Sequence, residues 1–281
     1  MIVDTHPHII SDDLVKYPVS PIGAVRSQWS IDRHVTVEGL LEEMDNAGVD
    51  KAIVVHATTV YGFDNSYVAD AIRPHTDRLG GVFTVNGRAD VAPYLADFWR
   101  SRPGMMGLRL FTAGSTLAGQ AYNVDDPATY PLWQMLSESG LPVCLQATAA
   151  AYPDVERLLK RFPGVTVILD HFGKPVLDAG TGEGDLRELA ALASYDNLFL
   201  KYTPHVVAAA RRADVRCQEV IAYVVRQFGA NRIMWGSNYP NNKGSLSTLL
   251  EECVEGLSEL SEGDRHQICA GTALKVYAGL G

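Results

Sequence analysis

The chain has 281 residues, a length that one α/β barrel domain commonly fills, and its hydrophobic fraction of 47% allows a sizeable core. The formal net charge is −9 and the basic cluster ARRADVR at 210–216 is short, so we expect no nucleic-acid partner. No apolar stretch approaches the ~20 residues that span a bilayer, so we expect no membrane association.

The segment MIVDTHPHII, residues 1–10, lacks the basic and apolar regions of a signal peptide, so we expect a cytoplasmic protein. The cysteines show neither the C-x-x-C spacing of a zinc site nor the pattern of a disulfide framework, which fits a reducing compartment. They are Cys144, Cys217, Cys253 and Cys269.

Short runs of β-branched and apolar residues alternate along the chain with longer helical patterns. We predict strands at residues 2–6, 51–57, 80–85, 104–111, 142–147, 165–171, 198–202 and 232–237. Helices are predicted between them. One covers 36–48, where Leu40, Leu41, Met44 and Val49 mark one face and Gly48 ends the helix; another covers 217–229 and also stops at a glycine.

Eight strands, each followed by a helix or a long loop, indicate parallel βαβ units, and eight is the number that closes a barrel. An open, doubly wound sheet would normally carry a glycine-rich phosphate-binding turn after its first strand, whereas this chain continues HPHIISDD. We therefore predict a single-domain α/β protein over residues 1–281, a (β/α)8 TIM barrel with its reacting groups at the C-terminal ends of the strands.

The first predicted strand ends in DTHPH, in which Asp4, His6 and His8 are spaced by two. On an extended strand this spacing places all three side chains on one face. Two imidazoles so placed can hold a metal or share a proton, although an isolated His-x-His pair more often forms local hydrogen bonds. At the end of a first barrel strand we favour a functional role for His6 and His8.

The sixth predicted strand ends in ILDHFGKP, residues 168–175. Strand alternation turns Asp170 and His171 to opposite faces, so we expect only one of them to face the barrel interior. Lys174, in the turn that follows, could hold a substrate carboxylate or could be solvated.

Four other strands place polar residues where substrate could bind. Arg109 lies between two leucines in a strand predicted to be buried, and a buried guanidinium needs an anionic partner such as a carboxylate. His56 ends the second strand, and Tyr61 belongs to the loop after it. Gln146 and Tyr202 end the fifth and seventh strands, and His205, which follows the seventh, is a further candidate.

Together these segments resemble the amidohydrolase superfamily, in its amidohydrolase-related (amidohydrolase 2) branch of lactonases and decarboxylases. The likeness covers essentially the whole chain and rests on DTHPH, AGVDKAIVV, GLRLF, LDHFGKP, RIMWGSNYP and the tail ICAGTALKVY. In metal-containing members, strand-one histidines, a strand-six histidine and a strand-eight aspartate surround one divalent ion. The resemblance implies His6, His8 and His171 as candidate ligands of zinc or manganese, although some related lactonases use such a cluster without metal.

Two departures from the family pattern bear on this expectation. Strand five offers Gln146 where many members carry a histidine or lysine, so we expect no two-metal site. Asn238 stands where an aspartate is common, and an amide can orient water but cannot accept a proton. Both departures lower the expected metal affinity.

We therefore expect a hydrolase that opens a lactone or similar cyclic ester of a small carboxylated compound. His6, His8 and His171 would polarise the carbonyl or activate water, Asn238 would position that water, and Arg109 with Lys174 would bind the carboxylate. The alternatives are a metal-dependent non-oxidative decarboxylase and a barrel that binds a small acid without catalysis. The helical outer surface could support a homodimer, but nothing in the sequence marks an interface.

Overall fold

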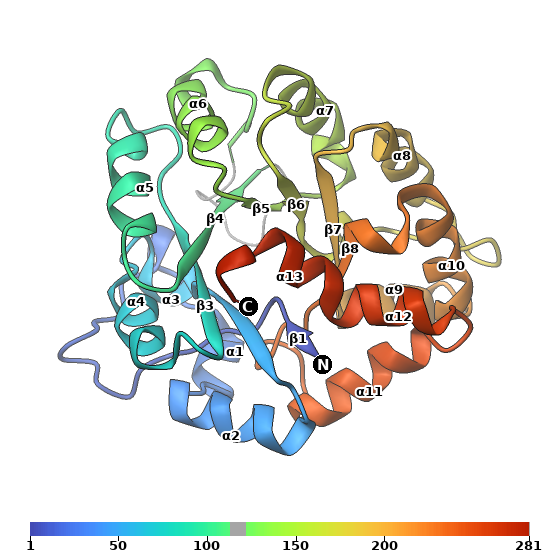
Figure 1. Cartoon of the computed structure of the whole chain (residues 1–281), viewed down its shortest axis with the longest axis horizontal. Coiled ribbons are helices and arrows are strands. Elements are labelled where there is room, and N and C mark those ends of the chain that lie inside the picture. The colour runs from blue at the N-terminus through green and yellow to red at the C-terminus, as the bar shows by residue number, and fades with distance from the viewer. Residues whose placement is uncertain (113–121, 281) are drawn as a thin grey trace.

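The protein, described here by a computed structural model over residues 1–112 and 122–280, forms a nearly closed barrel of eight parallel strands in the order β1 to β8 (Figure 1). The predicted TIM barrel is therefore confirmed. The strands are β1 Val3–Asp4, β2 Lys51–Val55, β3 Leu79–Thr84, β4 Met105–Phe111, β5 Val143–Gln146, β6 Val167–Leu169, β7 Leu198–Tyr202 and β8 Ile233–Trp235.

The last strand meets the first just beyond the regular part of the ladder. The backbone N–H of Thr5 donates to the carbonyl of Trp235 at 3.1 Å, and the Thr5 hydroxyl donates to the same oxygen at 2.6 Å. These bonds bring the C-terminal ends of β1 and β8 together, which places His6 and His8 beside the segment that carries Asn238.

The helices surround the barrel, and none in the described part of the chain is long and apolar enough to cross a membrane (Figure 1). They are α1 Gln28–Asp32, α2 Val37–Ala47, α3 Thr58–Tyr61, α4 Ser66–Ile72, α5 Ala92–Arg100, α6 Tyr130–Ser139, α7 Tyr152–Arg161, α8 Leu186–Ala191, α9 Pro204–Arg212, α10 Cys217–Phe228, α11 Leu246–Gly256, α12 Glu262–His266 and α13 Thr272–Val276.

Helix α2 shows how local sequence sets these elements. The Thr36 side chain accepts a hydrogen bond from the N–H of Gly39 at the helix start, and Gly48 ends the helix in the left-handed conformation with φ 67°. Leu40 and Met44 are fully buried on the face that packs toward the sheet, as their spacing predicts.

Strands β2 to β8 divide their side chains between two apolar cores. In β7, Leu198, Leu200 and Tyr202 pack in the core between strands and helices, whereas Phe199 belongs to the core inside the barrel. The same alternation turns Lys201 inward. Every second side chain of a strand therefore points into the barrel. This alternation determines which polar side chains reach the barrel interior.

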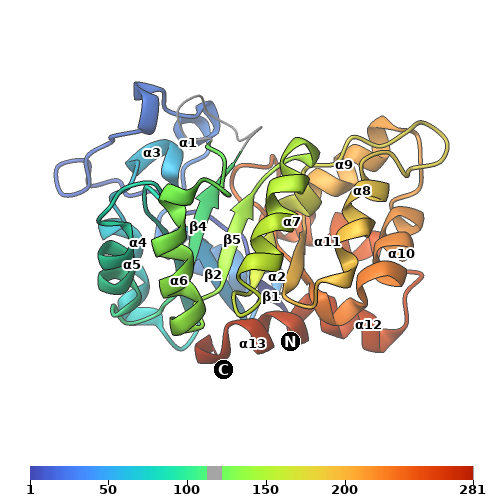
Figure 2. The same ribbon diagram turned by 90° about the horizontal axis from the view of Figure 1, so that it is seen from above.

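The two ends of the barrel differ. At the N-terminal end of the strands, α13 crosses the barrel, and Ala273 and Tyr277 fill the interior core there. Figure 2 shows α13 at one end, and α1, α3 and the N-terminal loop around them at the other. The end at which the strands' carboxyl termini emerge is therefore the open one.

Candidate active site

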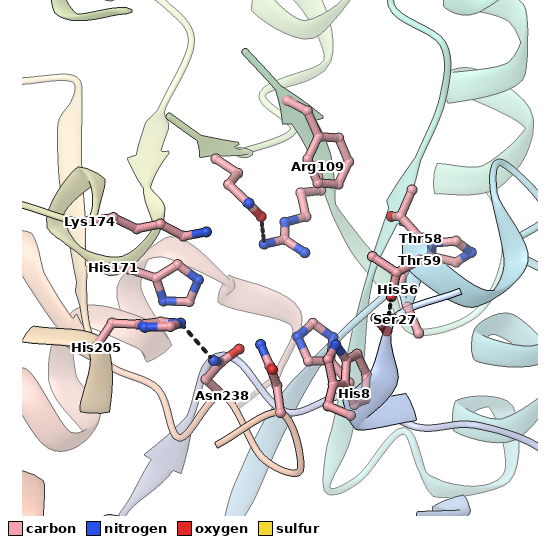
Figure 3. A pocket seen from close by; sticks show the side chains of 15 residues that line it. His8, Ser27, His56, Thr58, Thr59, Arg109, His171, Lys174, His205 and Asn238 are labelled. Carbon is pink, nitrogen blue, oxygen red and sulfur yellow. Dashed lines mark hydrogen bonds between the residues drawn. The ribbon is translucent and has the colours of Figure 1, made fainter. Parts of the chain in front are cut away.

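A cavity of about 200 Å³ opens at the C-terminal ends of the strands, the size of a small organic molecule (Figure 3). Most of the described lining residues lie at the end of a strand or a few positions after it, and every strand except β3 contributes at least one. The lining residues are His8, Ser27, Trp29, His56, Ala57, Thr58, Thr59, Arg109, Phe111, Gln146, His171, Lys174, His205, Asn238 and Asn241.

Three imidazoles meet at the floor of this cavity. The ring centroid of His6 lies 5.1 Å from that of His8 and 4.6 Å from that of His171. His6 is fully buried beneath the other two. The structure thus brings together the three histidines expected from the sequence, although β1 ends at Asp4 and His6 and His8 lie beyond the regular strand. Asp4 instead accepts hydrogen bonds from the backbone N–H and hydroxyl of Ser237.

The turn after β6 corrects the prediction that Asp170 and His171 face opposite ways. The strand stops at Leu169, and His171 and Phe172 adopt positive φ values of 58° and 53°, so strand alternation does not continue. Asp170 Oδ1 lies 3.3 Å from His6 Nδ1, and the ring of His171 contacts the ring of His6. Both residues therefore reach the histidine cluster.

Hydrogen bonds hold each imidazole at Nδ1. His8 Nδ1 lies 2.7 Å from the carbonyl of Val55, and because a carbonyl only accepts, this nitrogen carries the hydrogen. The neutral His8 ring therefore keeps its lone pair at Nε2. His171 Nδ1 lies 2.9 Å from the hydroxyl of Thr203.

Burial keeps these imidazoles uncharged near neutral pH. Burial, with help from the charge of Arg109, lowers the pKa of His8 to about 3. Burial also lowers the pKa values of His56 and His205 to about 4, and it lowers the pKa of His171 well below the ordinary value, with the neighbouring His6 acting in the same direction. The site therefore offers neutral rings that can accept a proton.

Among the described residues, two cationic side chains and no carboxylate line the cavity. The ammonium of Lys174 extends into it from the turn after β6, and the guanidinium of Arg109 extends into it from β4 (Figure 3). Burial, with the charge of Arg109, lowers the pKa of Lys174. An anionic ligand would relieve the repulsion between these two groups.

Arg109 also anchors the buried carboxylate. Its Nε donates to Asp170 Oδ2 at 3.0 Å, and its Nη2 donates to Gln146 Oε1 at 2.5 Å. Burial opposes ionisation of Asp170, but Lys201, His6 and Arg109 hold the pKa of its carboxyl well below the usual value. Asp170 is therefore an ionised internal group and not a proton donor.

Asn238 lies at the floor beside the histidines, in the left-handed conformation with φ 53°. Its Nδ2 donates to Asn242 Oδ1 at 2.6 Å and lies 3.2 Å from His205 Nε2. Because the two amide hydrogens point to Asn242 and His205, Asn238 Oδ1 remains available as an acceptor. The amide also interacts with His8.

Two of the residues expected to contact substrate do not line the cavity. Tyr202 faces away from the cavity, and its hydroxyl donates to the carbonyl of Cys253 at 3.1 Å, because its neighbour Lys201 takes the inward position. Tyr61 is buried behind the cavity wall, where its hydroxyl accepts from the N–H of Ser11. His56 does line the cavity, but its Nε2 is 2.8 Å from the carbonyl of Asp64.

Several lining residues were not expected from the sequence. Trp29 lies with its ring centroid 5.4 Å from that of His8, and the hydroxyls of Ser27 and Thr59 are 2.7 Å apart on the wall that includes Thr58 (Figure 3). Ser27 and Trp29 come from the long segment between β1 and β2, where no local pattern predicts a site. Lys201 was detectable, because a lysine inside an apolar strand needs a buried partner.

The comparisons with known proteins agree with this geometry. A model of the amidohydrolase family matches residues 3–279. The chain belongs to the amidohydrolase family. This confirms the resemblance and makes the protein a hydrolase of that group.

Curated relatives and a solved structure extend over most of the chain. An L-fucono-1,5-lactonase of Burkholderia ambifaria is 23% identical over 82% of this chain and 81% of its own. A 4-sulfomuconolactone hydrolase of Rhizobium radiobacter is 26% identical over 85% of this chain and 75% of its own. The structure of an amidohydrolase of Burkholderia multivorans with bound zinc has a TM-score of 0.81 at 22% identity and covers 99% of both chains.

The residues of this chain do not fit a divalent ion as they stand. Among the described residues, no group of three His, Cys, Asp or Glu side chains is placed to hold a metal. Asn238 contributes no negative charge, and the ionised Asp170 is already paired with Arg109 at 3.0 Å and Lys201 at 3.3 Å. The two charges of an ion would therefore lack compensation beside His6, His8 and His171.

Proposed function

We propose that the protein hydrolyses a lactone of a small compound that carries a carboxylate. The observation that carries this proposal is the cavity lining, in which Arg109 and Lys174 stand beside neutral imidazoles and the described part of the chain contributes no carboxylate. Cationic groups select an anionic substrate, and neutral imidazoles supply proton transfer. The names of the two curated relatives, both hydrolases of lactones, support the reaction class.

His8 is the proposed general base. The carbonyl of Val55 fixes its hydrogen at Nδ1, so Nε2 can take a proton from water while Asn238 Oδ1 accepts the water's second hydrogen. The water oxygen then bonds to the lactone carbonyl carbon, the ring C–O bond breaks, and the ring oxygen leaves with a proton returned from an imidazole. The products are a hydroxyl group and a second carboxylic acid, which ionises to a carboxylate and releases its proton to the solvent.

An anionic substrate would also strengthen this base. The charge of Arg109 is a cause of the low pKa of His8, second to burial. A carboxylate bound between Arg109 and Lys174 would neutralise part of that charge and raise the pKa of His8 toward the working pH. Substrate recognition and proton transfer are thus coupled through one guanidinium.

The test is a hydrolysis assay over a panel of five- and six-membered lactones, each compared with and without a carboxylate, followed by a pH indicator. We expect carboxylated members to be turned over with higher kcat/KM. His8→Gln, which keeps a donor for Val55 O, should lower kcat by about 10²–10⁴-fold because general-base catalysis is lost.

His34→Gln is the matched control, since His34 is exposed and bonded to Asp12 outside the cavity, and it should retain full activity. Carboxylated lactones that bind without being hydrolysed would contradict the proposal. Release of carbon dioxide from a carboxylated compound would instead establish a decarboxylase.

A further inference from the structure

Lys201 is the most deeply buried cation of the described chain that faces the histidine cluster, and its side chain is 0% exposed. It rises from β7 into the barrel interior beneath the cavity. Its Nζ lies 3.3 Å from each of three groups: His6 Nδ1, Cys144 Sγ and Asp170 Oδ1. An ammonium has three hydrogens and no lone pair, so it can only donate to these neighbours.

This donor restricts the tautomer of His6. A hydrogen bond from Lys201 Nζ requires a lone pair on His6 Nδ1, and a neutral ring then carries its hydrogen at Nε2. The competing arrangement, with Nδ1–H donated to Asp170, has the same 3.3 Å separation. However, Lys201 Nζ lies equally close to Asp170 Oδ1, so the ammonium competes with His6 for this acceptor.

The tautomer of His6 bears directly on metal binding. A histidine binds a metal through a nitrogen lone pair, and its other nitrogen usually donates to a carboxylate or carbonyl. His8 has this arrangement, with Nδ1–H on Val55 O and a lone pair at Nε2. His6 has the reverse: its Nε2 is buried and without a hydrogen-bond partner among the described residues, and Nδ1 faces an ammonium.

We propose that Lys201 is a positioning residue that holds His6 as the Nε2–H tautomer and thereby closes the histidine cluster to divalent ions. The ammonium supplies a fixed positive charge beneath the cluster, and His6 presents an N–H toward its neighbours in place of a lone pair. In the absence of Lys201, Asp170 would accept the Nδ1 hydrogen, and Nε2 of His6 would become a ligand beside those of His8 and His171.

The first experiment uses the unmodified protein and needs no substrate. A long-range ¹H–¹⁵N spectrum of protein labelled with ¹⁵N-histidine distinguishes protonated from unprotonated ring nitrogens, and the signals missing in His6→Gln assign that residue. We expect a protonated Nε2 and an unprotonated Nδ1 for His6. A protonated Nδ1 on His6 would overturn the proposal.

The second experiment measures zinc uptake after dialysis against zinc and then buffer, by elemental analysis. We expect Lys201→Met to bind zinc at least tenfold more tightly than the unmodified protein. Lys174→Met is the matched control, because it also removes one positive charge near His171 but leaves His6 untouched. Equal zinc affinity in Lys201→Met and the unmodified protein, or an equal rise in both variants, would contradict the proposal.

Discussion

Lys174 illustrates how a single backbone position serves the cavity. Its φ of 51° ends the left-handed turn that begins at His171, and this turn aims the ammonium into the cavity toward Arg109 (Figure 3). We expect Lys174→Met to raise KM for a carboxylated lactone tenfold or more, with a smaller effect on kcat, because a charge-assisted contact is worth about 1.5–3 kcal/mol.

The measurement is a comparison of steady-state kinetics for one lactone with and without its carboxylate. Lys16→Met, which removes an exposed lysine paired with Asp70, should leave both constants unchanged. A loss of the same size for the uncharged lactone would show that Lys174 does not bind the carboxylate.

At the residue scale, the sequence indicated which residues belong to the site, but it was less informative about which way their side chains point. His6, His8 and His171 could be grouped because strand ends converge in any barrel of this kind. Tyr202 and Asp170 were misplaced for opposite reasons: strand alternation was not applied to Tyr202, and it was applied to Asp170 although the strand had ended. In β7 an inward Lys201 requires an outward Tyr202, whereas after β6 the strand ends at Leu169 and alternation no longer applies.

At the scale of elements, the strands themselves were predictable and their ends were not. The predicted strands 2–6, 165–171 and 232–237 are observed as Val3–Asp4, Val167–Leu169 and Ile233–Trp235. Each of these three strands stops before the residues that line the cavity, because those residues leave the ladder and bend over the end of the barrel. Apolar composition marks a strand, but it carries no information about where such a bend starts.

The element that closes the opposite end is α13, together with Tyr277, which directly follows it. This side chain is 1% exposed in the core inside the barrel, and its hydroxyl lies 3.3 Å from Cys144 Sγ. We expect Tyr277→Ala to lower the free energy of unfolding by about 3–5 kcal/mol, the usual cost of removing a large buried aromatic ring. Tyr277→Phe should cost much less, because it keeps the ring.

Urea denaturation of the three proteins checks this expectation. Tyr94→Ala on α5 is the surface control, since Tyr94 is 77% exposed, and its effect should stay within about 0.5 kcal/mol. If Tyr277→Ala were as stable as Tyr94→Ala, α13 would not be needed to close the barrel.

At the scale of the whole molecule, the buried neutral histidines at the open end of the barrel make the stability of the fold depend on pH. His8, His56 and His205 have pKa values of about 3, 4 and 4, lowered mainly by burial. The unfolded chain binds protons at these rings below its ordinary pKa of about 6.5, whereas the folded chain does not. Folding is therefore fully favoured above about pH 6.5 and is progressively opposed as the pH falls toward 4.

His56 allows this linkage to be measured without touching the proposed base. His56→Gln can keep a donor for the carbonyl of Asp64, which His56 Nε2 approaches to 2.8 Å, but it cannot take up a proton. Between pH 7 and pH 5 the unmodified protein should lose up to about 2 kcal/mol more unfolding free energy than the variant, the equivalent of 1.5 pKa units for one group. Denaturant titrations at both pH values measure the difference, with His34→Gln, at an exposed ring, expected to follow the unmodified protein. Parallel losses in His56→Gln and the unmodified protein would mean that this ring is as easily protonated inside the barrel as in the unfolded chain, and burial would then not be what keeps it neutral.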